Sequence, residues 1–184
     1  MKVLAVSGSL RAGSYNTALA RATHELAPAG VEVELYDGLA TLPPYDADTD
    51  GVAEPVAVHE LRRQIDDADA VLFVTPEYNG SVPGVLKNAV DWASRPHRAA
   101  ALSGKTVAVA GVATGQYGAM WAQQDLRRIL GIAGARVIEG ELPVPRAHEV
   151  FDAAGRLASP VIAERLRSHL DSLVSQAAPV TLAA

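Results

Sequence analysis

The stretch AVLFVTPEYNGSVPGVLKNAVDWAS, residues 70–94, decides the fold. It opens with an apolar run, residues 70–75, continues through a polar loop that starts at Pro76, and turns at Pro83-Gly84 into a helical pattern. A short apolar run bounded by turn residues is typical of a parallel strand that is covered on both faces. The stretch therefore predicts a strand–loop–helix unit of an α/β protein, with an unusually polar loop after a buried strand.

The same alternation continues on both sides of this unit. Four further strands are expected at 3–6, 31–36, 105–113 and 135–138. Helices are expected from Ser14 to before Pro28, and over 55–68, 83–94, 119–130 and 159–175. This alternation predicts an α/β, flavodoxin-like three-layer sandwich, in which a parallel sheet has helices on both faces. Right-handed crossovers favour a five-stranded sheet of order 2-1-3-4-5. We expect residues 1–175 to form one domain and residues 176–184 to be a frayed tail.

Composition narrows the class of protein. The chain has 184 residues, enough to bury one hydrophobic core without disulfides or metals to stabilise it. Its net charge of -5 argues against nucleic-acid and anionic-membrane partners. It has no cysteine, which excludes disulfides, thiolate metal sites and a cysteine nucleophile. No apolar run reaches the roughly 18 residues of a membrane span, and the N-terminus does not resemble a secretory signal. A cytoplasmic protein is expected.

No metal site is expected. The five histidines show no metal-ligand spacing. Asp46, Asp48 and Asp50 alternate as in a calcium loop and Gly51 takes the sixth position, but Ala57 stands where the twelfth-position glutamate belongs. We interpret the segment 42–55 as a long, solvated surface loop.

Ligands of such a sheet bind beyond the carboxyl ends of the strands, where the strand order reverses. For the order 2-1-3-4-5 this point lies between the first and third strands. The loops after Val6 and Val74 should therefore flank the site, with the loop after Ala113 beside them.

The first loop combines serines, an arginine and an amide just before a helix N-terminus. Unpaired N–H groups at such a terminus bind phosphates. Ser9, Ser14 and Asn16 can add hydrogen bonds, and Arg11 can add a charge-assisted pair. The alternative is a plain turn with a serine cap. The loop contains neither the Gly-Lys-Ser/Thr of a P-loop nor G-x-G-x-x-G, so nucleotide hydrolysis and a Rossmann site are not expected.

The second loop offers an aromatic ring beside an amide. The backbone and Asn79 could hydrogen-bond the edge of a heterocycle, and Tyr78 could pack on its ring. The alternative is a structural loop in which Asn79 forms an Asx turn. The third loop, residues 114–118, offers glycines for a close backbone approach.

Together these residues resemble the NADPH-dependent FMN reductase family. The resemblance covers residues 1 to about 144 and rests on Gly8-Ser9-Leu10-Arg11-x-x-Ser14-x-Asn16, Thr75-Pro76-Glu77-Tyr78-Asn79 and Pro83-Gly84-x-Leu86-Lys87-Asn88-Ala89-x-Asp91-Trp92. It implies an FMN-dependent reductase that uses NADPH or NADH as co-substrate and a quinone, flavin or other small molecule as electron acceptor. It also implies a homodimer or homotetramer, in which the 42–55 loop could face a neighbour's flavin.

The resemblance also implies which residues bind the cofactor. They are Ser9, Arg11, Ser14, Tyr15, Asn16, Pro76, Glu77, Tyr78, Asn79, Thr114, Gly115 and Tyr117. No catalytic side chain is required, because flavin N5 carries the hydride. We expect the N–H groups near Gly115 and the N-terminus of the helix that follows to stabilise negative charge on the reduced flavin.

Two other functions use the same fold. A flavodoxin-like single-electron carrier would serve protein partners, but the modest charge and Arg11 argue against it. A signalling receiver needs aspartates at the strand ends, which here are Ser7, Thr75 and Thr114. The sequence does not choose among acceptors, between NADH and NADPH, or between dimer and tetramer.

Overall fold

The computed structural model describes residues 1–97 and 99–178, so residues 179–184 of the expected tail lie outside the described part. The elements follow the alternation that the sequence predicts. In chain order they are β1 (Lys2–Ser7), α1 (Tyr15–Leu26), β2 (Glu32–Tyr36), η1 (Gly38–Thr41), α2 (Val56–Asp67), β3 (Ala70–Thr75), α3 (Gly84–Ala93), β4 (Thr106–Val112), α4 (Met120–Ile132), β5 (Arg136–Val137), β6 (Leu142–Val144), α5 (Ala147–Val150) and α6 (Pro160–Ala177).

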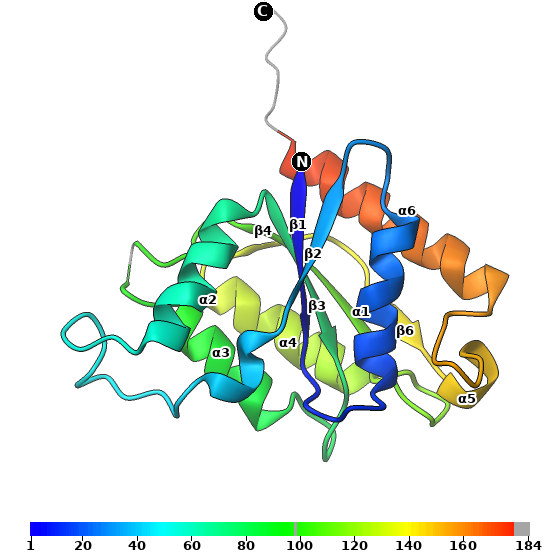
Figure 1. Ribbon diagram of the computed structural model, residues 1–184, viewed down its shortest axis with the longest axis horizontal. Helices are drawn as coiled ribbons and strands as arrows, with labels where there is room; N and C mark the ends of the chain where they lie inside the picture. The colour runs from blue at the N-terminus through cyan, green and yellow to red at the C-terminus, as the bar shows by residue number, and fades with distance from the viewer. Residues whose placement is uncertain (98, 179–184) are drawn as a thin grey trace, which may run out of the picture.

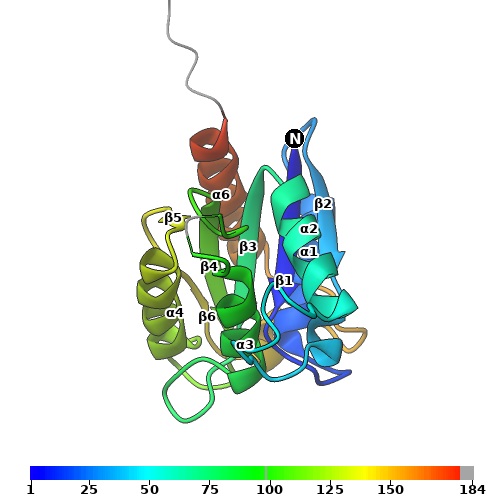
Figure 2. The ribbon, with the colours of Figure 1, turned by 90° about the vertical axis from the view of Figure 1, so that its left-hand side faces the viewer.

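All strand pairs are parallel, and the order β2-β1-β3-β4-β5 confirms the predicted topology. Figure 1 shows β1 and β3 in the middle of the molecule, with their carboxyl ends at the lower edge of the view. We call the edge of the sheet at which the strands end the carboxyl edge. The apolar runs of β1, β3 and β4 are buried because helices cover both faces of the sheet (Figure 2).

The two faces of the sheet have separate cores. On one face α1 and α6 pack against strand residues such as Val3 and Ala5. On the other face α2, α3 and α4 pack against their neighbours Leu4 and Val6, because successive strand residues point to opposite faces. Trp92 of α3 is fully buried in this second core.

The fifth strand position differs from the prediction. The strand expected at 135–138 is reduced to β5, which pairs with Thr106 and Val107, and a second short strand, β6, pairs with residues 110–112 of β4. The strand β6 was not predicted; it has three residues and contains Pro143, and a proline suits an edge position because it removes a ladder donor. As a result, β6 reaches the carboxyl edge, where Ala113 donates to the Val144 carbonyl at 3.1 Å.

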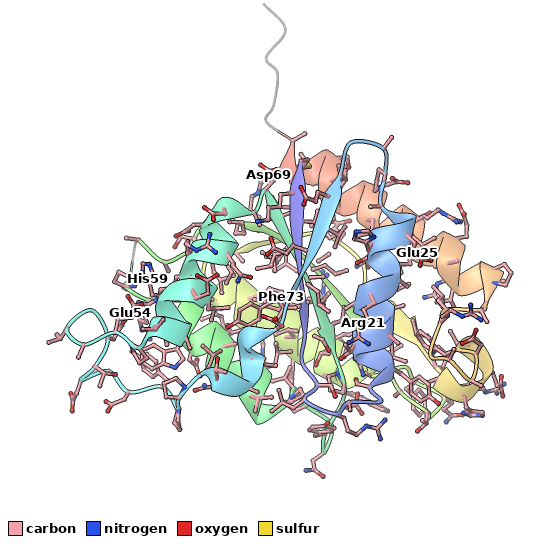
Figure 3. All side chains as sticks on the ribbon, in the orientation of Figure 1. Arg21, Glu25, Glu54, His59, Asp69 and Phe73 are labelled. Atoms are coloured by element: carbon pink, nitrogen blue, oxygen red, sulfur yellow. The ribbon has the colours of Figure 1, made fainter. Side chains whose placement is uncertain are left out.

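The 42–55 loop is fastened to the helices beneath it. The Pro43 carbonyl accepts hydrogen bonds from Asn88 and Trp92, both 2.8 Å long. Arg62 of α2 pairs with Asp50 and Glu54 of the loop and also donates to the Trp92 carbonyl. Figure 3 shows Glu54 beside α2, where the loop returns to the helix. No helix in the described part of the chain is long and apolar enough to cross a membrane.

Candidate functional site

Three loops meet at the carboxyl edge of the sheet (Figure 1): β1–α1, β3–α3 and β4–α4. Hydrogen bonds join them. Gly8 donates to the Val74 carbonyl at 2.8 Å, so the first loop leaves the sheet against β3. Glu77 of the second loop accepts from the backbone of α4, which follows the third. The topology therefore brings the three groups of predicted site residues together.

The β1–α1 loop has the hydrogen-bonding groups of a phosphate site. The Ser14 hydroxyl caps α1 by accepting from the N–H groups of Asn16 and Thr17, as predicted. Arg11 is exposed, and among the described residues its guanidinium donates only from Nη2 to the carbonyl of Gly13, at 3.0 Å. In the described part of the chain, the following backbone N–H groups of the loop donate no hydrogen bond: Ser9, Leu10, Ala12 and Gly13.

Two other predicted residues of this segment point into the protein. The Asn16 side chain, 4% exposed, donates from Nδ2 to the Val112 carbonyl at 3.0 Å and accepts from the Val112 N–H at 2.9 Å. It therefore joins α1 to the end of β4. The Tyr15 ring packs on Phe151, with ring centroids 5.4 Å apart. The structure gives both residues a structural role, and their contact with a cofactor stays a prediction.

The β3–α3 loop is a tight hairpin. Tyr78 and Ser81 exchange two backbone hydrogen bonds, of 3.0 and 3.2 Å, around Asn79 and Gly80. Both central residues have positive φ, 53° and 76°, which matches a type I′ turn. Asn-Gly is the strongest short-range signal for this turn, and the sequence analysis did not use it. The turn projects Tyr78 outward, where 52% of it is exposed, while Pro76 is buried.

The Glu77 carboxylate lies at the start of α4. Its Oε2 accepts hydrogen bonds from the N–H groups of Trp121 and Ala122, at 3.1 and 3.3 Å. The N-cap residue of the helix, Ala119, has no side chain that could do this. This arrangement corrects the expectation that the N-terminus of this helix is free to stabilise a reduced flavin, because Glu77 already occupies two of its donors.

The β4–α4 loop exposes the remaining predicted residues, Thr114, Gly115 and Tyr117. The Tyr117 ring meets Trp121 edge to face, with centroids 4.8 Å apart and planes at 64°. Trp121 is 48% exposed, and the sequence analysis missed it; its signal was a large aromatic residue in the first turn after a glycine-rich loop. With Tyr78, these residues give the carboxyl edge three half-exposed aromatic rings.

These groups fit FMN. Unpaired N–H groups and the Arg11 guanidinium match a phosphate monoester, and the exposed rings match a flat heterocycle. A parallel sheet of this order, with such loops at its switch point, defines a flavodoxin-like nucleotide-binding protein. A model of the family described as NADPH-dependent FMN reductase matches residues 1–149, and the chain belongs to this family.

Known relatives agree over nearly the whole chain. An NAD(P)H-dependent FMN reductase of Pseudomonas aeruginosa is 42% identical over 174 residues, 94% of this chain and 93% of that protein. A quinone reductase of Pseudomonas putida is 46% identical over 156 residues, 84% and 83% of the two chains. The structure of the flavoenzyme NAD(P)H:(acceptor) oxidoreductase of Paracoccus denitrificans covers 96% of both chains, with a TM-score of 0.86 and 35% identity.

The predicted family, fold and cofactor are thus confirmed. The protein is an oxidoreductase that uses FMN and a nicotinamide nucleotide.

Proposed function

We propose that the protein reduces quinones with electrons from NADPH or NADH, through FMN bound at the three loops of the carboxyl edge. The observation that carries this proposal is that a loop with N–H groups that have no acceptor in the described part of the chain and three exposed aromatic rings lie at the same edge of the sheet. The quinone reductase of Pseudomonas putida supports quinone as the acceptor, because it shares 46% of its residues with this chain over most of both lengths.

In this proposal the β1–α1 loop binds the FMN phosphate. The N–H groups of Ser9, Leu10, Ala12 and Gly13 have no acceptor among the described residues, so this short segment offers donors that a phosphate would use. Arg11 is free to leave the Gly13 carbonyl for a stronger, charge-assisted pair with the phosphate. The Ser14 hydroxyl accepts in its cap and still has a proton to donate.

The 76–81 hairpin and the Thr114–Tyr117 segment would hold the ring system. The hairpin backbone would meet the polar edge of the ring, and Tyr78, Tyr117 and Trp121 would pack near its faces. When bound, FMN supplies the redox chemistry, hydride acceptance from a reduced nicotinamide and electron delivery to a second substrate. The protein then needs to orient the ring and leave one face open, so that two flat substrates can use it in turn.

The oligomeric state and the compartment belong to the same proposal. Leu10, Met120 and Trp121 leave apolar surface exposed around the site, which a second copy of the chain would cover. This supports a dimer or a tetramer. A cytoplasmic location follows from the composition and stays a prediction.

An anaerobic absorbance experiment tests the proposed function. FMN-reconstituted protein is mixed with NADPH or NADH, and a simple benzoquinone is then added. The flavin band should bleach with a nicotinamide and return with the quinone in a stoichiometric step. A flavin that bleaches but does not return would exclude quinone as the acceptor. A flavin that stays oxidised would favour the single-electron carrier.

A further inference from the structure

The 76–81 hairpin is tied to α4 at two points, one on each side of its turn. On one side the Glu77 carboxylate accepts from the N–H groups of Trp121 and Ala122. On the other side the Ser81 hydroxyl donates to Asp125 at 2.7 Å. The two attachment points lie one turn apart on α4, so the helix acts as a rigid support for the hairpin.

The described residues supply no other side-chain cap for this helix. Ala119 at the N-cap has a left-handed backbone and no capping side chain, and the first turn of α4 contains no acidic residue. A carboxylate placed on the first N–H groups satisfies two orphan donors and offsets the positive end of the helix dipole. Glu77 comes from a different loop, so this cap also fixes a tertiary contact between the two loops.

We propose that Glu77 is a positioning residue, which clamps the 76–81 hairpin to α4 and neutralises the positive end of that helix beside the flavin. This inference rests on the proposed assignment of the hairpin as the loop that holds the flavin ring. It assigns to Glu77 a role different from direct contact with the cofactor. The carboxylate sets where Tyr78 and the hairpin backbone stand, and its charge opposes the build-up of negative charge on reduced FMN.

Three variants separate the effect of the hydrogen bonds that hold the hairpin from the effect of the Glu77 charge. Glu77→Gln keeps an oxygen acceptor and removes the charge, Glu77→Ala removes both, and Ser81→Ala removes only the second tie. Glu164→Gln, an exposed carboxylate on α6 that pairs with Arg167, is the matched control. All four are compared with the wild type for amide hydrogen exchange without FMN, for FMN affinity by fluorescence quenching, and for midpoint potential.

The clamp predicts the following pattern. Glu77→Ala should speed exchange at the Trp121 and Ala122 amides about tenfold and weaken FMN binding about tenfold. Glu77→Gln should stay within about threefold of the wild type in both. It should nevertheless bind reduced FMN up to about tenfold more tightly relative to oxidised FMN, a rise of up to about 30 mV for a two-electron couple. Ser81→Ala should weaken FMN binding without moving the potential.

Three results would overturn the proposal. Unchanged exchange and affinity in Glu77→Ala would show that no clamp exists. An unchanged potential in Glu77→Gln would remove the electrostatic role. An equal loss of FMN affinity, beyond about a hundredfold in both Glu77 variants, would make the carboxylate a direct ligand. If the wild type bound no FMN, the assignment of the flavin site would fail, while the exchange data would still decide whether Glu77 holds the loop.

Discussion

His169 of α6 donates a hydrogen bond from Nε2 to the backbone carbonyl of Val109, 3.1 Å away. Val109 of β4 pairs with Phe73 of β3 on one side. On the other side it lies between the residues that pair with β5 and those that pair with β6, so the broken fifth strand leaves that side of Val109 without a strand partner. The imidazole, 9% exposed, replaces the missing strand. Because a carbonyl can only accept, the proton of the neutral ring must lie on Nε2.

This contact predicts a loss of stability in mild acid. Burial is the largest effect and lowers the pKa of His169. The hydrogen bond to the Val109 carbonyl, the second-largest effect, raises the pKa, while the positive charges of Arg127 and Arg165 lower it and Glu141 raises it; the net shift of the pKa is downward. The neutral ring is thus favoured in the folded state. Below the unfolded pKa of about 6.5 the unfolded chain binds a proton that the folded chain excludes, so stability is complete above that pH and falls below it.

Urea unfolding at pH values from about 7.5 to about 5.5 measures this effect. The variant His169→Gln should lose part of the pH dependence. His148→Gln, which changes an exposed histidine, should keep it. If His169→Gln and the wild type showed the same slope of unfolding free energy with pH, the assignment to His169 would be wrong.

Alanine substitutions at two glycines of the β4–α4 loop, Gly118 and Gly115, should have very different effects on stability. The φ of Gly118 is +59°, and a Cβ there would lie 2.5 Å from the backbone nitrogen of Val144, so Gly118→Ala forces the third loop away from β6. We expect it to destabilise the fold by about 2 kcal/mol or more. Gly115→Ala meets no atom within 4 Å and should leave the unfolding midpoint almost unchanged. Equal midpoints in urea would contradict this packing.

The fold was predictable because its signals are local and agree with one another. Each buried strand is an apolar run, Ser14 caps its helix as expected, and the last helix begins at Pro160 after its cap Ser159, within the range predicted for it. What the sequence analysis missed depends on distant contacts. The three residues of β6 form a strand only because β4 offers them an edge, and α5 is a single turn.

The sequence predicts which loops form the site, but not how each side chain in them is oriented. Strand order determines which loops meet, but the direction of a side chain depends on partners far away in sequence. Glu77 finds its partners 44 and 45 residues away, and Asn16 finds its partner 96 residues away. No local pattern shows that these polar groups are used for structure.

Arg62 and Arg63 are neighbours in α2 with different expected effects on stability. Arg62 is 12% exposed and bonds Asp50, Glu54 and the Trp92 carbonyl, so Arg62→Ala leaves several partners unpaired. We expect a loss of about 2 kcal/mol and faster proteolysis within the 42–55 loop. Arg63→Ala removes only exposed pairs and should have a much smaller effect. Similar unfolding curves for the two variants would show that Arg62 does not hold the loop.

A substitution at Asn16 tests whether this buried amide in the first turn of α1 holds the structure together or binds the ligand. The substitution Asn16→Ala leaves the N–H and the carbonyl of Val112 without their partner in a buried place. We expect a loss of about 2–4 kcal/mol of unfolding free energy in the absence of FMN. Chemical denaturation of the FMN-free protein measures it. A stable variant that had lost FMN affinity would instead identify Asn16 as a phosphate ligand.

We expect the opposite for Arg11, because its guanidinium is exposed and, within the part of the chain that the structure describes, donates only to the Gly13 carbonyl of its own loop. Arg11→Ala should therefore leave the unfolding curve unchanged while it weakens FMN binding about 10- to 100-fold, the value of a charge-assisted bond to phosphate. Arg21→Ala is the control, since Arg21 lies on α1 (Figure 3), outside the loop. Riboflavin, which lacks the phosphate, should bind the wild type and Arg11→Ala equally. Equal FMN affinity in the two arginine variants would place the phosphate elsewhere.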